Sequence, residues 1–207
     1  MSRMLIEVGT VSPRLPENAP VNEFLQMMLA EVDIDPTQFE GRGRDVRRAI
    51  QFAKREIASK RGVDYSELMD DQLSDDWNYH LFPNVTFNIH PEGALMMMFR
   101  PHHKDPEKFI YSITVLVRPS DDPDFVMPAY MGVPEGTDLS GNYRPERIKL
   151  VADAQEFGPV LTQDAVAVPW VQKGLRSRAF KGVRLSEQEQ RVRHYHAEID
   201  RFVEGRK

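Results

Sequence analysis

The hydrophobic period of this 207-residue chain changes twice, and each change limits the folds open to it. Apolar residues recur at spacings of three and four over residues 21–32 and 43–60, which predicts two helices. Residues 85–89 and 109–118 instead alternate between apolar and polar side chains, as strands with one buried face do. A helical period returns after residue 145. Helices, then strands, then helices predict an α+β fold.

The connections between the predicted elements indicate how the chain is organised. Short turns separate strands at 85–89, 94–100 and 109–118, so we expect an antiparallel meander. The first 20 residues are expected to be an extended connector. We expect one domain over residues 1–207, divided into a helical and connector part at 1–76, antiparallel strands at 77–118, a long loop at 119–143 and C-terminal helices at 144–207.

Two helices are expected in the C-terminal part. One runs from about residue 145 to 180, with a break at Pro159, and the other runs from Ser186 to Val203. Ser186 and Glu189 have the spacing of a capping box, which favours a helix start there.

Composition narrows the class of partner. Lys and Arg number 27 against 32 Asp and Glu, a formal net charge of −5, and no basic stripe is interleaved with aromatic residues, so a nucleic-acid partner is not expected. No apolar run approaches the roughly 20 residues that a membrane span needs. Residues 1–7 contain no apolar stretch of signal-peptide length, and we therefore expect a cytoplasmic protein.

The sharpest local feature is a carboxylate in an apolar helical stripe. Asp164 shares one predicted helix face with Leu161, Val168, Val171 and Leu175. An ionised Asp in apolar surroundings needs a backbone cap, a cation or a metal, since desolvation without one costs several kcal/mol. Spacing alone leaves a structural role open, in which Asp164 caps a helical segment or pairs with an Arg. Pro169 is expected to kink the helix near this carboxylate.

Three segments carry a family resemblance. Val160 to His196 reads VLTQDAVAVPWVQKGLRSRAFKGVRLSEQEQRVRHYH, in which an acidic residue after Gln precedes Gln-x-Gly-Leu-x-Ser. Residues 81–90 (LFPNVTFNIH) and 100–106 (RPHHKDP) contain a Phe-Pro-Asn strand and then Arg-Pro and Asp-Pro. In order and spacing these segments resemble the C-terminal catalytic domain of the large (alpha) subunit of Rieske-type aromatic-ring-hydroxylating oxygenases. The resemblance covers most of residues 76–203 and is less distinct before them.

The resemblance implies a fold and a chemistry. The fold is a helix-grip (START/SRPBCC-like) domain, an antiparallel sheet packed on a long C-terminal helix around a hydrophobic cavity. The chemistry is dioxygen insertion into a hydrophobic, aromatic substrate at a mononuclear Fe(II) held by two His and one carboxylate, with Asp164 at the carboxylate position. Electrons come from NAD(P)H through a reductase, often with a ferredoxin. The assembly is a trimer-type homo-oligomer or a complex with a small beta subunit.

Two implied parts have no counterpart in the chain. A Rieske 2Fe-2S cluster needs two Cys and two His, and the chain contains no Cys. The resemblance places the Rieske domain and both His ligands of the mononuclear iron in a segment before residue 1, and residues 1–75 contain no His. We therefore expect the isolated chain to be inactive.

The histidines present favour structural roles. They are His80, His90, His102, His103, His194 and His196. The first two flank a strand, the middle two lie in a turn, and the last two are about 200° apart on a helix. An unrelated enzyme with a surface metal site at His102, His103 and Asp105 is a remaining alternative.

Other features keep two interpretations each. Thr86 and Asn88 share a strand face and either line a pocket or face solvent. Met96, Met97 and Met98 alternate faces of a strand and favour core or cavity lining over a copper site. A basic region predicts a solvated helix face or, alternatively, a surface for an acidic partner; its residues are Arg42, Arg44, Arg47, Arg48, Lys54, Arg55, Lys60 and Arg61. The alternative to an oxygenase is a non-catalytic ligand-binding or assembly protein with a helix-grip cavity.

Overall fold

The computed structural model describes most of the chain. The described residues are 1–7, 16, 18–120, 122, 125, 127–134, 136–139, 146–149 and 158–206. They fall into two compact units, one made of residues 1–100 and 110–143 and the other of residues 101–109 and 144–207.

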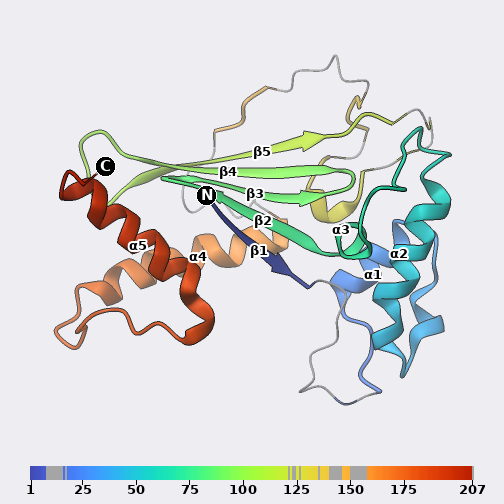
Figure 1. The fold of residues 1–207 in the computed structure, drawn as a ribbon, viewed down its shortest axis with the longest axis horizontal. Helices are drawn as coiled ribbons and strands as arrows, with labels where there is room; N and C mark the ends of the chain where they lie inside the picture. The colour runs from blue at the N-terminus through green and yellow to red at the C-terminus, as the bar shows by residue number, and fades with distance from the viewer. Residues whose placement is uncertain are drawn as a thin grey trace. The chain divides into compact units, whose positions relative to one another are not determined.

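A five-stranded antiparallel sheet dominates the first unit (Figure 1). Its strands are β1 (Ser2–Ile6), β2 (Asp76–Leu81), β3 (Val85–His90), β4 (Gly93–Pro101) and β5 (Phe109–Val117). They lie in sequence order, β1-β2-β3-β4-β5, so every neighbour in the sheet is also a neighbour in the chain. The predicted α+β class and the meander of β3, β4 and β5 are confirmed.

The sequence analysis misses β1 and includes β2 only as part of the strand region expected at 77–118. Residues 2–6 were expected to belong to a connector, but they pair with β2, with Ser2 opposite His80 and Ile6 opposite Asp76. β1 lies at a sheet edge and is mostly exposed, so it needs no buried apolar face to mark it. β2 does alternate, with polar residues on one face (Asp76, Asn78 and His80) and aromatic or apolar residues on the other (Trp77, Tyr79 and Leu81), although no separate strand was predicted there.

Three helices gather at one end of the sheet and form a small core (Figure 1). They are α1 (Glu23–Ala30), α2 (Val46–Ile57) and α3 (Asp70–Ser74), with short 3-10 turns η1 (Pro36–Phe39) and η2 (Gly43–Asp45) between the first two. The buried cluster between α1 and α2 consists of Val21, Leu25, Met28, Leu29, Phe39, Val46 and Ile50. The Asn22 side chain caps α1 by accepting the Leu25 N–H at 2.9 Å. Gly62 follows α2 with a left-handed backbone at φ +67°, a conformation that commonly ends a helix.

The second unit contains α4 (Gly158–Leu175), the 3-10 turn η4 (Glu187–Glu189) and α5 (Gln190–Val203). The break expected at Pro159 is instead close to the start of α4, because a residue without an N–H fits the first turn of a helix. The predicted cap at Ser186 is confirmed, since its N–H donates to Glu189 Oε2 at 2.6 Å. Of the helices described, none is long and apolar enough to cross a membrane.

Gly93 provides a test of the packing between the β3–β4 turn and β5. A Cβ at this position would lie 2.1 Å from the Leu116 carbonyl oxygen, so Gly93→Ala must displace backbone. We expect a loss of about 2–3 kcal/mol in the free energy of unfolding, measured by urea denaturation. Gly41→Ala also has a positive φ but meets nothing within 4 Å, and it controls for backbone strain. Equal losses in the two variants would refute the close approach at Gly93.

Candidate functional site

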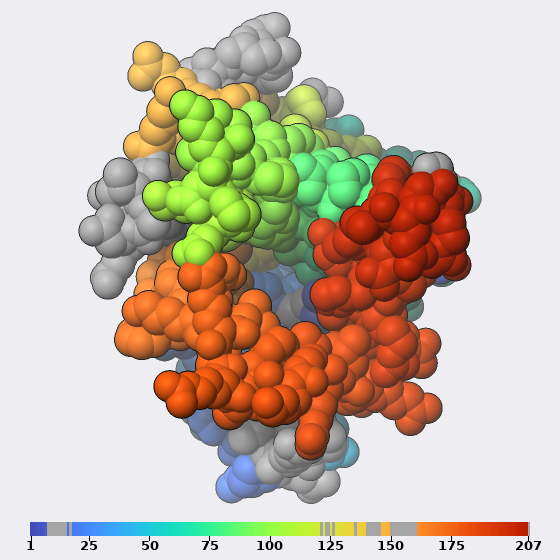
Figure 2. Space-filling model, turned by 90° about the vertical axis from the view of Figure 1, so that its left-hand side faces the viewer, coloured from blue at the N-terminus to red at the C-terminus, as the bar shows by residue number. Residues whose placement is uncertain are grey.

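Asp164 lies on α4, and its surroundings differ from those expected. Asp164 is exposed, and among the described residues its carboxylate has no Lys or Arg partner. The apolar residues of its face are exposed too, with Val168 at 45% and Val171 at 61%. The expected burial of this stripe is therefore not found within its own unit, where no described segment covers the face. Residues of α4 and α5 belong to the orange and red surface that faces the viewer in Figure 2.

The helix that carries Asp164 is shorter than the one expected from about residue 145 to 180, since residues 146–149 and 176–180 are not helical. α4 continues through Pro169 to Leu175. On the same helix, the Lys173 ammonium lies 4.3 Å from the Trp170 ring centroid, a cation–π contact at the exposed face. Asp164 thus stands on a regular helix with its carboxylate open to a cation from elsewhere.

The described residues do not complete a metal site. Among them, no three His, Asp or Glu side chains gather closely enough to hold an ion. The surface site suggested for His102 and His103 is not formed, since His102 Nδ1 accepts the Asp105 N–H at 3.1 Å and closes the β4–β5 turn. His194 and His196 are both exposed, on opposite faces of α5.

One face of β2 and β3 carries a ladder of polar pairs. Across the two strands Asn78 faces Asn88 and His80 faces Thr86. The Asn78 and Asn88 amides are hydrogen-bonded to each other. Thr86 Oγ1 is buried and has no hydrogen-bond partner among the described residues. Thr86 and Asn88 are therefore half-buried and do not face open solvent. The buried hydroxyl of Thr86 makes no hydrogen bond to a described residue.

The methionines of β4 alternate as predicted. Met96 and Met98 lie opposite Phe87 and Val85, on the face away from the polar ladder, whereas Met97 lies opposite Thr86. All three methionines are half-buried. They line both faces of the sheet and do not gather as metal ligands would.

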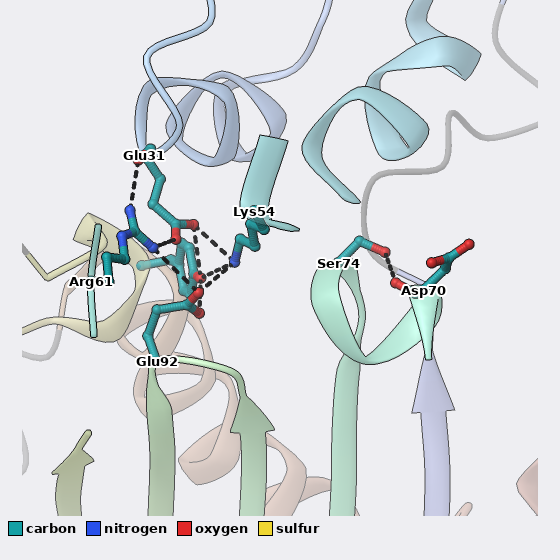
Figure 3. Close-up of polar contacts among 7 residues, drawn as sticks. Glu31, Lys54, Arg61, Asp70, Ser74 and Glu92 are labelled. Atoms are coloured by element: carbon teal, nitrogen blue, oxygen red, sulfur yellow. Dashed lines mark hydrogen bonds and ion pairs between the residues drawn. The ribbon is translucent and has the colours of Figure 1, made fainter. Parts of the chain in front are cut away.

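The most densely charged site in the first unit is a buried cluster that the sequence analysis misses (Figure 3). We call it the ionic cluster; it consists of Glu31, Lys54, Arg61, Glu92 and Tyr130. Lys54 Nζ lies 2.9 Å from Glu92 Oε1 and 3.1 Å from Glu31 Oε2. Arg61 Nη1 lies 3.1 Å from Glu31 Oε1. The Lys54 side chain is 0% exposed and both glutamates are 1% exposed, so the charges neutralise one another away from water.

Burial sets the protonation behaviour of the ionic cluster. It raises the pKa of Glu31 to about 7, against the attraction of Lys54. Burial acts in the same direction on Glu92, but attraction to Lys54 and hydrogen bonds outweigh it and lower the pKa of that carboxyl. Burial would lower the pKa of Lys54, whereas attraction to both glutamates raises it. Nearby on β3, burial lowers the pKa of His90 to about 4, with Lys54 adding to the effect.

The ionic cluster corrects the interpretation of the basic region. Lys54 and Arg61 were expected on a solvated face, but both are buried. Arg47 forms a bidentate ion pair with buried Asp75. Arg55 Nη2 lies 2.7 Å from Asp70 Oδ1. These four cations pair with carboxylates of the same unit, whereas Arg48 of α2 is exposed, so the region is only in part the solvated basic face that was expected.

A sequence signal for Lys54 exists in hindsight. It lies four residues after Ile50, which in turn lies four residues after Val46, so it continues the buried stripe of α2. A lysine in such a stripe must meet a carboxylate. The sequence does not reveal which carboxylate, because Glu92 lies 38 residues away.

The comparison with known families agrees with the resemblance. Residues 26–205 match the family described as ring hydroxylating alpha subunit (catalytic domain). The chain belongs to this family. The match extends well before residue 76, where the sequence resemblance was less distinct. No curated protein and no solved structure matches the chain.

Membership in the ring-hydroxylating alpha-subunit family supports an oxygenase role, which makes the chain an oxidoreductase by family. The family implies a mononuclear iron in the catalytic domain. The donors described here fit that iron only in part, since they offer one open carboxylate on α4 and no cluster of ligands.

Proposed function

We propose that this chain supplies the catalytic-domain part of a ring-hydroxylating oxygenase and that Asp164 is its carboxylate ligand to Fe(II). The observation that carries the proposal is the family match over residues 26–205, which includes α4 and the motif around Asp164. The open carboxylate supports it, because Asp164 is not engaged by a cation of the described residues.

The chain's own contribution to this iron is limited to one ligand. Two His ligands would have to come from outside the described residues, so we derive no step of the reaction through the metal. Iron with open coordination positions supplies the redox chemistry that dioxygen requires. The role of α4 is to present a carboxylate on a rigid element.

The remaining features of the proposal follow from the family. We infer a hydrophobic or aromatic substrate, electrons from NAD(P)H through a reductase and ferredoxin, an oligomer of trimer type or one with a small beta subunit, and a cytoplasmic location. The 2Fe-2S cluster would lie on another segment, because the chain contains no Cys. A non-catalytic binding or assembly protein is less favoured, since the matching family is a catalytic domain.

Thr86 offers a way to look for a ligand on the polar ladder. Replacing a buried, unpartnered hydroxyl by a methyl removes an unmet hydrogen-bonding group, so Thr86→Val should leave stability unchanged or raise it by about 1 kcal/mol. If the hydroxyl serves a substrate, KM should rise roughly fivefold to tenfold. Thr114→Val, at an exposed position of β5, controls for the gain in strand propensity. An unchanged KM would remove Thr86 from substrate binding.

The direct test of the proposed function is the origin of oxygen in the product. The protein is purified from its own cells with the polypeptides that remain bound to it, supplied with NADH and a panel of arenes, and exposed to ¹⁸O₂. Hydroxylated or dihydrodiol products labelled from ¹⁸O₂ are expected. Labelled products at the same rate from a preparation depleted of this chain would contradict the proposal.

A further inference from the structure

Tyr130 joins the long loop to the ionic cluster. It lies on the 3-10 turn η3 (Ala129–Met131), and its hydroxyl is 3.2 Å from both Glu31 Oε2 and Glu92 Oε2. Its ring lies 5.8 Å from the ring of Phe24 on α1. Met127 and Met131 beside it are buried at 6% and 3% exposure. The turn is thus anchored through Tyr130, whose ring packs on α1 and whose hydroxyl reaches the ionic cluster.

Tyr130 cannot make full hydrogen bonds to both glutamates while both carboxyls are ionised. A phenol has one hydrogen and can donate it to one carboxylate only. The second oxygen-to-oxygen approach becomes a full hydrogen bond only when that carboxyl carries a proton, which it then donates to the Tyr130 oxygen. Lys54 Nζ, 3.5 Å from that oxygen, is too distant to replace such a bond.

We propose that the ionic cluster and Tyr130 form a proton-dependent lock that holds residues 127–134 against α1 and α2. The lock is complete when one proton is added to Glu31, giving a chain in which Glu31 donates to Tyr130 and Tyr130 donates to Glu92. Without that proton, Glu31 keeps its pairs with Lys54 and Arg61, but the segment is held by one hydrogen bond in place of two.

The groups that face Glu31 leave it as the residue that titrates near neutrality. Lys54 and Tyr130 have raised pKa values and Glu92 a lowered one, so all three keep their charge states between pH 5.5 and 8. His90, whose ring lies 5.2 Å from that of Tyr130, stays neutral in this window because burial lowers its pKa to about 4. Arg61 stays charged.

Tyr65, between α2 and α3, is the other ionisable side chain electrostatically coupled to the cluster. It is buried, and its pKa is raised by burial and then by Glu92, while Arg118 stacks over its ring at 5.8 Å. It therefore stays a neutral phenol below pH 8.

The direction of the pH effect follows from linkage. Burial raises the pKa of Glu31 from 4.5 to about 7 in the folded state. Undocking of residues 127–134 removes Tyr130 from beside this carboxyl and admits water, which would lower its pKa toward the ordinary value, so the docked state binds the proton more tightly. The stabilisation from the lock is fully present below pH 4.5 and is lost as pH rises toward and through about 7. The segment should therefore open more readily at pH 8 than at pH 5.5.

Hydrogen–deuterium exchange of the full chain tests the lock. The reporters are the Met131 and Gly132 amides, which donate to Pro128 O and Ala129 O at 2.9 and 3.1 Å. After correction for intrinsic exchange rates, their protection should fall about tenfold between pH 5.5 and 8, the equivalent of one net hydrogen bond. Equal protection at both pH values would overturn the proposal.

Two variants and a control make the test specific. Tyr130→Phe keeps all four charges and should lower protection at pH 5.5 to a level that no longer depends on pH. Glu31→Gln has an amide that can donate to Tyr130 at any pH, so it too should abolish the pH dependence. Glu56→Gln removes an exposed carboxylate of α2 and should behave as the wild type. A pH dependence that survives in Tyr130→Phe or in Glu31→Gln would refute the lock.

Discussion

Lys54→Ala is expected to lower the free energy of unfolding by about 3–5 kcal/mol, as the removal of one partner from a buried ion pair does. Lys54 Nζ reaches both Glu31 and Glu92 within 3.1 Å, and all three side chains are at most 1% exposed. Without the ammonium, two buried carboxylates share Arg61 alone. Arg61 Nη1 lies 3.8 Å from Glu92 Oε1, so its hold on that carboxylate is weak.

The loss is measured by urea denaturation, with Lys60→Ala as the matched control. Lys60 is 62% exposed and lies 3.5 Å from Asp122, so its removal should cost less than about 1 kcal/mol. Changing Lys54 to Met together with Glu92 to Gln removes opposite charges at once and should recover part of the loss. A Lys54→Ala variant as stable as Lys60→Ala would show that Lys54 does not hold the ionic cluster together.

Asp164→Ala is expected to reduce hydroxylation by about a hundredfold or more while the fold is retained. Loss of a metal ligand weakens binding by at least the 10–100-fold that loss of a supporting residue causes. Asp164 is exposed, so its removal leaves no cavity and no unpaired buried charge among the described residues. Activity and stability should therefore separate.

Three comparisons sharpen this test. Asp164→Glu keeps a carboxylate one methylene further out and should retain a measurable part of the activity, whereas Asp164→Asn should behave like Asp164→Ala. Asp200→Ala removes an exposed carboxylate of α5 and should leave the rate unchanged. Full activity in Asp164→Ala, measured in the same native preparation, would remove Asp164 from the site.

Much of the fold is readable from local pattern. β3 and much of β5 alternate, β4 is a short apolar run between two turns, and the core stripe of α2 recurs at helical spacing, so the α+β class follows from the chain itself. The capping pair Ser186 and Glu189 marks the start of the last helical segment. It can be predicted from the sequence because the two residues are only three positions apart.

What the sequence does not reveal depends on distant partners. β1 is defined only by its pairing with β2, some 70 residues later in the chain. Lys54 looks like a solvated lysine until Glu92 and Glu31 are brought to it by the β3–β4 turn and the end of α1. The ligand role of Asp164 was inferred from family resemblance, whereas the burial inferred from its apolar neighbours is not found within the unit that contains α4.

The iron content of the natively purified protein tests the central claim most directly. Metal is quantified by mass spectrometry in the wild type, in Asp164→Ala and in Asp200→Ala, each purified with its bound polypeptides. We predict about one mononuclear iron per chain in the wild type and in Asp200→Ala, beyond any iron of a 2Fe-2S cluster, and at least a tenfold loss of that iron in Asp164→Ala. The same content of mononuclear iron in Asp164→Ala as in the wild type would contradict the assignment of Asp164 as a ligand.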